Sequence, residues 1–162
     1  MCEALEKKTL DYGASTTIVA VQLRGNELAM VNTGDSRAYL LRRDDAIQMR
    51  SRDHTEKQKL LDEGTATEGT DYASVYDSLS DCLIADPEAE GFAVHRETAK
   101  LLLGDRVILC SDGVHDVFDQ EAWLAAMVQE ATPLSMAAET RRRVLLSGAP
   151  DNFSIITLRL GY

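Results

Sequence analysis

The sequence predicts one α+β domain that spans residues 1–162. The first third of the chain alternates short β-branched, apolar runs with Gly, Asn and Asp turn signals, which is typical of antiparallel strands joined by hairpins. Two adjacent segments near the C-terminus repeat apolar residues at helical spacing, and a last apolar run follows them. Because strands and helices are segregated in this order, the pattern favours α+β over a doubly wound parallel sheet.

The N-terminal third is predicted to form a β-meander. Residues 1–11 are either the end of a helix or a tail. Gly25-Asn26 is a hairpin signal, and Gly34-Asp35 interrupts the apolar run that precedes it. Asp44-Asp45 marks a further turn. The expected strands are 16–23, 27–33, 37–42 and 46–50.

The rest of the chain is predicted to contain a short helix, a long loop, two adjacent helices and three further strands. Gly64 is placed to end a helix over 56–63, and residues 65–90 form a long polar segment, either a functional loop or a surface connection. Asp119 and Thr132 are N-cap candidates for two helices. The first of these helices should bury Trp123, Leu124, Met127, Val128 and Ala131, and the second Leu134, Ala137, Ala138, Val144 and Leu145. The expected strands are 92–97, 106–111 and 152–160.

Charge and composition exclude several partners. The chain has 17 Lys plus Arg and 27 Asp plus Glu, a net charge of −10, which disfavours nucleic acid and anionic membrane surfaces. The sequence has no apolar run of the roughly 18 residues that a membrane span needs. Three cysteines without paired spacing predict a reducing, cytoplasmic location. Cys110 lies inside an apolar run and is expected to be a buried small hydrophobic residue.

Aspartates at the ends of the predicted strands are the candidate functional residues. Asp112 follows the apolar run 106–111, with Asp116 four residues later, and Asp151 precedes the last strand. Asp35 lies at the end of its own strand. Each aspartate alone is more often a turn or cap residue. Several carboxylates held together by a rigid scaffold form a site for hard divalent cations, which take oxygen ligands.

Five blocks of the sequence resemble the type-2C family of metal-dependent (PPM-type) Ser/Thr protein phosphatases. They occur in the family's order and at similar spacing over nearly the whole chain. The matching blocks are residues 13–17, 32–40, 53–55, 103–117 and 151–156.

The resemblance implies an antiparallel β-sandwich flanked by helices, with a pair of Mn²⁺ or Mg²⁺ ions at one end. It implies that Asp112 and Asp151 ligate the metal core and that Asp35 and Asp116 hold an additional, weaker ion. Gly113, Asn152 and Ser36 are expected to support these ligands. The family hydrolyses phosphoserine and phosphothreonine with metal-activated water, and the segment 65–90 matches the variable flap beside the substrate cleft.

The sequence departs from the family at its start. It lacks the Asp-Gly-x-Gly-Gly motif whose Asp and Gly bridge the two metals, and also the nearby phosphate-binding Arg and general-acid His. None of His54, His95 and His115 matches that His, so no catalytic side chain is assigned. We therefore expect an incomplete metal site and an open sheet edge, since N-terminal strands of the family fold are missing.

Two functions are compatible with the sequence. One is a phosphatase of bacterial type that acts on a phosphoprotein once another chain supplies the missing segment. The other is a non-catalytic relative that works as a binding or oligomerisation module, with a second copy or a partner chain covering the open sheet.

Overall fold

A computed structural model describes residues 14–42, 47–67, 74–86 and 91–161. The predicted N-terminal segment 1–11 and the turn at Asp44-Asp45 lie outside the described residues. The strands are β1 (Ser15–Thr16), β2 (Ile18–Arg24), β3 (Glu27–Thr33), β4 (Arg37–Leu41), β5 (Met49–Arg50), β6 (Leu83–Ile84), β7 (His95–Lys100), β8 (Arg106–Cys110) and β9 (Ile155–Arg159). The helices are α2 (Glu56–Asp62), the 3₁₀ turn η1 (Ser74–Asp77), α3 (Asp112–His115), α4 (Gln120–Gln129) and α5 (Pro133–Leu146).

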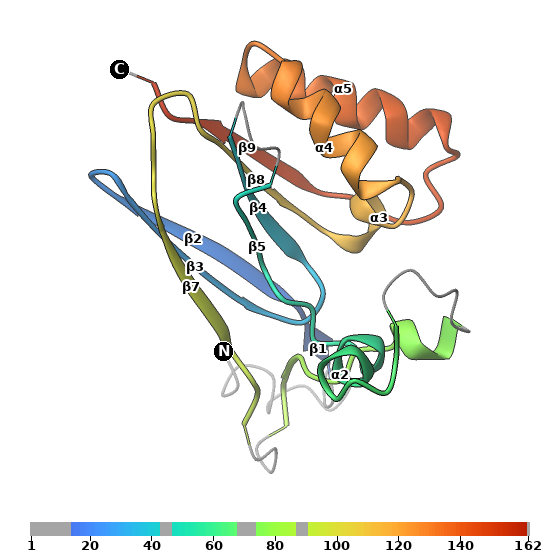
Figure 1. Cartoon of the computed structure of the whole chain (residues 1–162). Helices are drawn as coiled ribbons and strands as arrows, with labels where there is room; N and C mark the ends of the chain where they lie inside the picture. The colour runs from blue at the N-terminus through green and yellow to red at the C-terminus, as the bar shows by residue number, and fades with distance from the viewer. Residues whose placement is uncertain (1–13, 43–46, 68–73, 87–90, 162) are drawn as a thin grey trace.

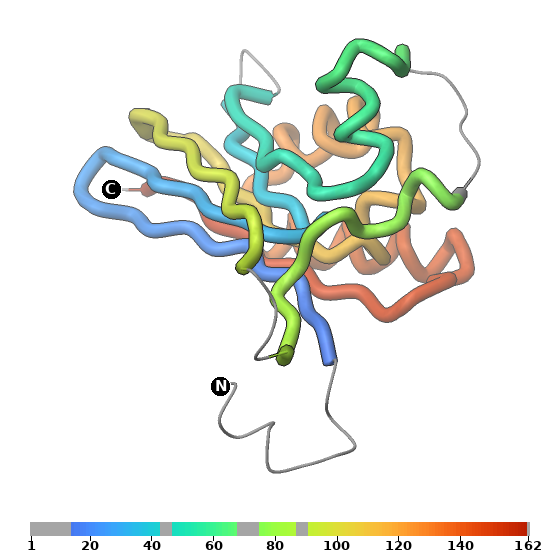
Figure 2. The backbone as a smooth tube through the Cα atoms, turned by 90° about the horizontal axis from the view of Figure 1, so that it is seen from below, coloured from blue at the N-terminus to red at the C-terminus, as the bar shows by residue number. Residues whose placement is uncertain are grey.

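Two antiparallel sheets and a helical layer make up the body of the fold. A three-stranded sheet has the order β2-β3-β7, and a four-stranded sheet has the order β5-β4-β8-β9. Figure 1 shows α4 and α5 on one side of the four-stranded sheet and the β2–β3 hairpin on the other. Figure 2 shows from below that this hairpin projects away from α2 and α3. The predicted α+β class with an antiparallel sandwich flanked by helices is confirmed.

The four-stranded sheet is buried on both faces. Tyr39, Ile108 and Cys110 pack toward the helices, in a cluster with Trp123, Leu124 and Met127 of α4 and Met136 of α5. The alternate residues Leu40, Val107 and Leu109 pack between the sheets, against Leu28 and Met30 of β3. All five residues of β8 are buried, because this strand lies at the centre of the sheet between β4 and β9. Cys110 is 3% exposed, which confirms the expectation of a buried residue.

The predicted continuous meander is wrong, because the chain changes sheets between β3 and β4. β2 and β3 pair in one sheet, and β4 pairs with β5 and β8 in the other. Gly34 makes the crossing possible. Its φ is +88°, and a Cβ at this position would lie 2.4 Å from Thr17 Cγ2. The crossing leaves Asp35 and Ser36 at the end of the sandwich.

Some element boundaries and one helix face also differ from prediction. β7 begins at His95 rather than at residue 92, and the predicted strand 46–50 is reduced to Met49–Arg50. In α5, Leu134 is 79% exposed, and the buried residues are Met136, Thr140 and Val144. The buried face of α5 was not recognised from the sequence because it includes the polar Thr140. The hydroxyl of Thr140 is accommodated there by accepting a hydrogen bond from Trp123 Nε1 at 3.2 Å.

The caps of the helices follow the sequence signals. Asp119 accepts from the Ala122 N–H at 2.8 Å at the start of α4. Thr132 and Ser135 form a reciprocal capping box at the start of α5, with Pro133 in its first turn. Gly64, with a φ of +69°, follows the C-cap of α2. Ala131, predicted to be on the buried stripe of α4, is exposed.

Candidate metal centre

The four predicted carboxylate ligands all come from segments at one end of the four-stranded sheet. Asp35 lies in the crossing before β4, and Asp112 is the first residue of α3 after β8. Asp116 is the C-cap residue of α3, and Asp151 comes shortly before β9. Since β8 and β9 are paired neighbours, with Cys110 opposite Ile155, the segments of Asp112 and Asp151 leave the sheet side by side.

Asp35 and Asp112 interact electrostatically. Burial of Asp35 raises the pKa of its carboxyl above the ordinary value, and the negative charge of Asp112 raises it further. The Asp112 carboxylate accepts from the N–H of Gly113 at 2.8 Å. A cation placed beside these two carboxylates would offset the repulsion that Asp35 experiences from Asp112.

His115 connects Asp116 to the segment of Asp35. Its ring is buried, with Nε2 3.1 Å from the backbone oxygen of Asp35 and Nδ1 2.8 Å from Asp116 Oδ1. The close approach of the His115 ring lowers the pKa of the Asp116 carboxyl. The sequence pattern gave little reason to single out His115, because it occupies a variable position of the matching block, and its link to Asp35 spans 80 positions of the chain.

Asp35 and Asp116 line a cavity of about 490 Å³ beside α2. Asp112 and Asp151 are not among its lining residues, and Asp151 lies with Asn152 at a separate shallow depression. Asp151 is exposed, and its Oδ1 accepts from the N–H of Asn152 at 2.7 Å. The remaining lining residues of the cavity are Arg37, Asp53, Thr55, Lys57, Gln58, Leu61, Asp77 and His115.

The supporting residues hold these segments together. Gly113 lies against the Asn152 backbone, where a Cβ would be 2.4 Å from the carbonyl oxygen. The Ser111 N–H donates to the Ser154 oxygen at 3.1 Å, and the Ser154 N–H donates to Ser111 Oγ at 3.0 Å. Ser36 Oγ lies 2.7 Å from Thr17 Oγ1, which ties the crossing segment to the start of β2.

His54 and His95 have structural partners. His54 Nδ1 accepts from the N–H of Gly34 at 3.2 Å, and His95 Nδ1 lies 3.2 Å from Asn32 Oδ1. Both rings therefore brace the segment that leads to Asp35. Within the described residues, no group of three or more His, Cys, Asp or Glu side chains is arranged to hold a metal ion. Asp35 interacts electrostatically with Asp112 and shares a cavity with Asp116, while Asp151 lies at a separate depression.

Replacing Gly113 with alanine should lower the free energy of unfolding by about 2–3 kcal/mol, because either α3 or the Asn152 segment must shift to admit the methyl group. The measurement is urea denaturation followed by circular dichroism. Gly161→Ala is the control, since a Cβ there would meet no atom within 4 Å among the described residues. Equal stability of the two variants would contradict the close approach of α3 and Asn152.

Replacing Asp35 with asparagine should stabilise the metal-free chain at pH 7, by about 0.5 kcal/mol after allowance for solvent screening. A carboxyl whose pKa is raised on folding stabilises the fold while it is protonated, and this contribution is lost as pH rises through the folded-state pKa. The difference in stability between the two proteins should therefore vanish below pH 3.8, the ordinary pKa of an aspartate, because the carboxyl is then protonated in both the folded and the unfolded state. Thermal unfolding between pH 3 and 7 tests the sign.

Comparison with known proteins supports the resemblance seen in the sequence. A family model described as "Protein phosphatase 2C" matches residues 3–60. The Ser/Thr protein phosphatase PstP of Mycobacterium tuberculosis is 35% identical over 148 residues, which is 89% of this chain and 27% of that protein. A crystal structure of M. tuberculosis PstP matches with a TM-score of 0.87 and 29% identity, over 99% of this chain and 66% of that one. The chain belongs to the type-2C (PPM-type) Ser/Thr phosphatase family.

This type-2C chain spans only part of its relatives, 27% of the curated PstP and 66% of the PstP crystal structure. A structure of the PstP catalytic domain "in complex with 2 Manganese ions" matches with a TM-score of 0.76 and 28% identity, over 98% of this chain and 65% of that one. Manganese is thus present in the catalytic domain of a relative. Within the described residues, none of the helices has the length and apolar character to cross a bilayer.

Proposed function

We propose that this chain supplies one part of a Mn²⁺- or Mg²⁺-dependent phosphoserine/phosphothreonine phosphatase domain. The observation that carries the proposal is the placement of Asp35 and Asp112 at one end of the sandwich, where burial and the charge of Asp112 raise the pKa of the Asp35 carboxyl. Asp116 and Asp151 come from the adjoining segments. Oxygen ligands of this kind fit hard divalent cations.

The metal site of these 162 residues is incomplete in this proposal. The sequence contains no Asp-Gly-x-Gly-Gly motif, and the described residues bring no three candidate ligands together. Asp112, Asp151, Asp116 and Asp35 are the side chains that would hold the cations. A cation bound by them would activate water for attack on a phosphate monoester. The missing bridging carboxylate must come from a segment outside these residues.

The chain's own residues would orient this site rather than carry proton transfer. The β8–β9 pairing and the Gly113–Asn152 contact fix the relative positions of the Asp112 and Asp151 segments. The Arg37–Asp53 ion pair and the buried His115 support the cavity beside Asp35 and Asp116. A phosphoprotein substrate would approach along this cavity, where Lys57 adds a positive charge. The free thiols of Cys82 and Cys110 suit the cytoplasmic location that the sequence predicts.

Metal titration and phosphatase assays test the proposal. We expect the isolated chain to bind Mn²⁺ with a dissociation constant of about 1 mM, the range of weak carboxylate sites, and to turn over para-nitrophenyl phosphate negligibly. Co-expression with the PstP segment that this chain does not span should produce Mn²⁺-dependent turnover. Asp112→Asn or Asp151→Asn should abolish that turnover, while Glu121→Gln on the exposed side of α4 should leave it intact.

Two outcomes would contradict the proposal. Two tight Mn²⁺ sites in the isolated chain would show that no external ligand is required. Turnover by the complemented protein that survives both aspartate substitutions would show that these residues are not the ligands.

The alternative function, a non-catalytic oligomerisation module, is favoured by a different observation. β2 is an edge strand on which Ile18 and Leu23 are 42% and 46% exposed. Unpaired edges with apolar side chains favour association with another chain. Light scattering after size-exclusion chromatography should show a dimer if this function applies. A monomer at a protein concentration of about 100 μM, which exceeds the dissociation constants of stable dimers, would exclude self-association.

A further inference from the structure

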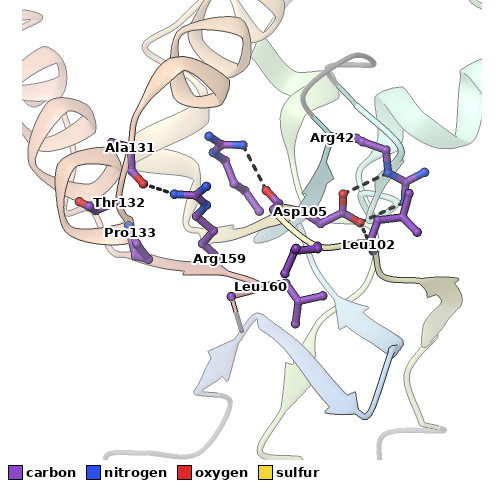
Figure 3. Close-up of a pocket in the computed structure, with 12 residues that line it drawn as sticks. Arg42, Leu102, Asp105, Ala131, Thr132, Pro133, Arg159 and Leu160 are labelled. Carbon is purple, nitrogen blue, oxygen red and sulfur yellow. Dashed lines mark hydrogen bonds and ion pairs between the residues drawn. The ribbon is translucent and has the colours of Figure 1, made fainter.

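A second cavity lies at the opposite end of β8 from the carboxylates. It has a volume of about 630 Å³ and lies where the β7–β8 turn, the end of β9 and the α4–α5 connection meet. Figure 3 shows the side chains that line it, with Arg42 and Asp105 on one side and Arg159, Ala131 and Pro133 on the other. The proposed phosphatase chemistry does not use this cavity. Arg106, which lines it, begins β8, whereas Asp112 follows Cys110 at the other end of this five-residue strand.

Positive charge is concentrated in this cavity. Its ionisable lining residues are three arginines, Arg42, Arg106 and Arg159, and one aspartate, Asp105, so its formal charge is +2. The whole chain has a net charge of −10. A local excess of arginine in an acidic protein attracts small anions, since cavity walls of low dielectric concentrate the field of the charges.

The arginine side chains are held in place by contacts from several segments. The Arg42 Nε and Nη2 atoms each lie 3.0 Å from a carboxylate oxygen of Asp105. The Asp105 side chain is 1% exposed, and it also accepts a hydrogen bond from the Leu102 N–H at 2.8 Å. Arg106, 6% exposed, donates to the Gly104 and Glu130 carbonyl oxygens at 3.2 and 3.0 Å. These contacts fix the positions of both guanidinium groups before a ligand arrives, which lowers the entropic cost of binding.

Arg159 completes the cationic side of the cavity. Its Nη1 donates to the Ala131 carbonyl oxygen, and its side chain is otherwise exposed. The start of α5, at Thr132 and Pro133, also lines the cavity. A helix N-terminus adds a partial positive charge in the same place.

The rest of the lining is apolar. Leu102 and Leu103 are each 54% exposed at the β7–β8 turn, and Leu160 also lines the cavity. Exposed leucines beside fixed guanidinium groups suit a ligand with two parts, an anionic head and an apolar body. Guanidinium binds carboxylates and phosphates through the same paired N–H groups, so both heads fit this chemistry.

We propose that this cavity binds a small organic anion, in which a carboxylate or a phosphate monoester is attached to an apolar body. The anionic head contacts Arg159 and the neighbouring arginines, and the apolar body packs on Leu102 and Leu103. The site is independent of the metal centre, and its occupation requires no divalent cation.

Binding is tested with phenyl phosphate, benzoate and the neutral benzyl alcohol, each titrated into the ¹⁵N-labelled chain in the presence of EDTA. EDTA removes divalent cations, so failure of this test leaves the proposed phosphatase function untouched. We expect at least one of the two anions to bind with a dissociation constant of about 1 mM, as befits so small a ligand, and benzyl alcohol not to saturate. The amide signals of Gly104, Ala131 and Gly161 should shift, and the stronger anion identifies the head group.

Substitutions at the cavity give the second part of the test. Arg159→Gln should weaken binding about five- to tenfold, because it removes one charge-assisted contact at an exposed position. Arg159→Lys keeps the charge without the planar fork and should have an intermediate effect. Leu103→Asn should weaken phenyl phosphate binding about threefold through loss of apolar contact. The matched control is Arg141→Gln, an exposed arginine on α5 outside the cavity.

The proposal is overturned by any of three results. One is that neither anion shows saturable binding up to about 20 mM, a concentration far above the dissociation constant expected for ligands of this size. Another is binding that shifts amides around α3 instead of those at the β7–β8 turn. The last is an affinity that Arg159→Gln and Arg141→Gln change equally, which would indicate non-specific attraction to surface charge.

Discussion

Replacement of Trp123 by alanine is expected to lower the free energy of unfolding by about 3–5 kcal/mol, the largest loss that any single substitution in the helix-side core should cause. Trp123 is 1% exposed. Its ring meets Tyr39 edge-on at a centroid distance of 5.8 Å and stacks on Phe118 at 5.6 Å. Its Nε1 donates to Thr140, so the variant also leaves a buried hydroxyl without this partner.

Urea denaturation monitored by far-ultraviolet circular dichroism measures this loss. Fluorescence is unsuitable because Trp123 is the chain's single tryptophan. Trp123→Phe, which keeps an aromatic ring but loses the hydrogen bond, should cost about 1–2 kcal/mol. Leu134→Ala, at a position 79% exposed, should stay within about 0.5 kcal/mol of the parent. A loss below about 1 kcal/mol for Trp123→Ala would mean that α4 does not anchor the helical layer as described.

Replacement of Asp53 by alanine is expected to cost about 3–5 kcal/mol, because it leaves the Arg37 guanidinium buried without its carboxylate. Arg37 Nε lies 2.9 and 3.0 Å from the two carboxylate oxygens, and the side chains of Arg37 and Asp53 are 17% and 9% exposed. Burial works to lower the pKa of Arg37, but the hydrogen bond and charge of Asp53 raise it above the ordinary value.

A double variant separates the ion pair from simple packing. Arg37→Met combined with Asp53→Ala removes both charges and should be more stable than Asp53→Ala alone, measured by the same urea titration. Asp62→Ala breaks the surface pair with Arg52 and should cost less than about 1 kcal/mol. If Asp53→Ala and Asp62→Ala had equal effects, the Arg37–Asp53 pair would be behaving as a surface ion pair.

The elements with a regular burial pattern along their whole length were the ones best predicted from the sequence. The bounds of β3 match the prediction, since its buried residues alternate along the strand. β8 ends one residue early, and its apolar run is typical of a strand buried on both faces. The caps Asp119 and Thr132 were also predictable, since their side chains bond within three residues of the chain. Local chemistry determines both kinds of feature.

Features that depend on distant contacts were not predictable from local patterns. The α5 face was misassigned because the polar Thr140 lies on its buried side, where its hydroxyl bonds to Trp123, 17 residues away. The change of sheets at residues 34–36 depends on which strands β4 pairs with, and β8 is far along the chain. In the candidate metal centre, the placement of the four aspartates at one end of the sheet followed from strand ends, but the contacts of His115 with Asp35 and Asp116 did not.

The central position of β8 has a consequence for the exchange of amide protons with solvent. Its N–H groups are enclosed by β4 and β9 within the sheet, and by the helical layer and the β2-β3-β7 sheet on its faces. Their hydrogens should therefore be released only when the whole domain opens, whereas those of the edge strand β2 should be released through local fraying. Because this one strand reaches from the aspartates to the arginines, a molecule bound at either end should slow deuterium uptake along its entire length.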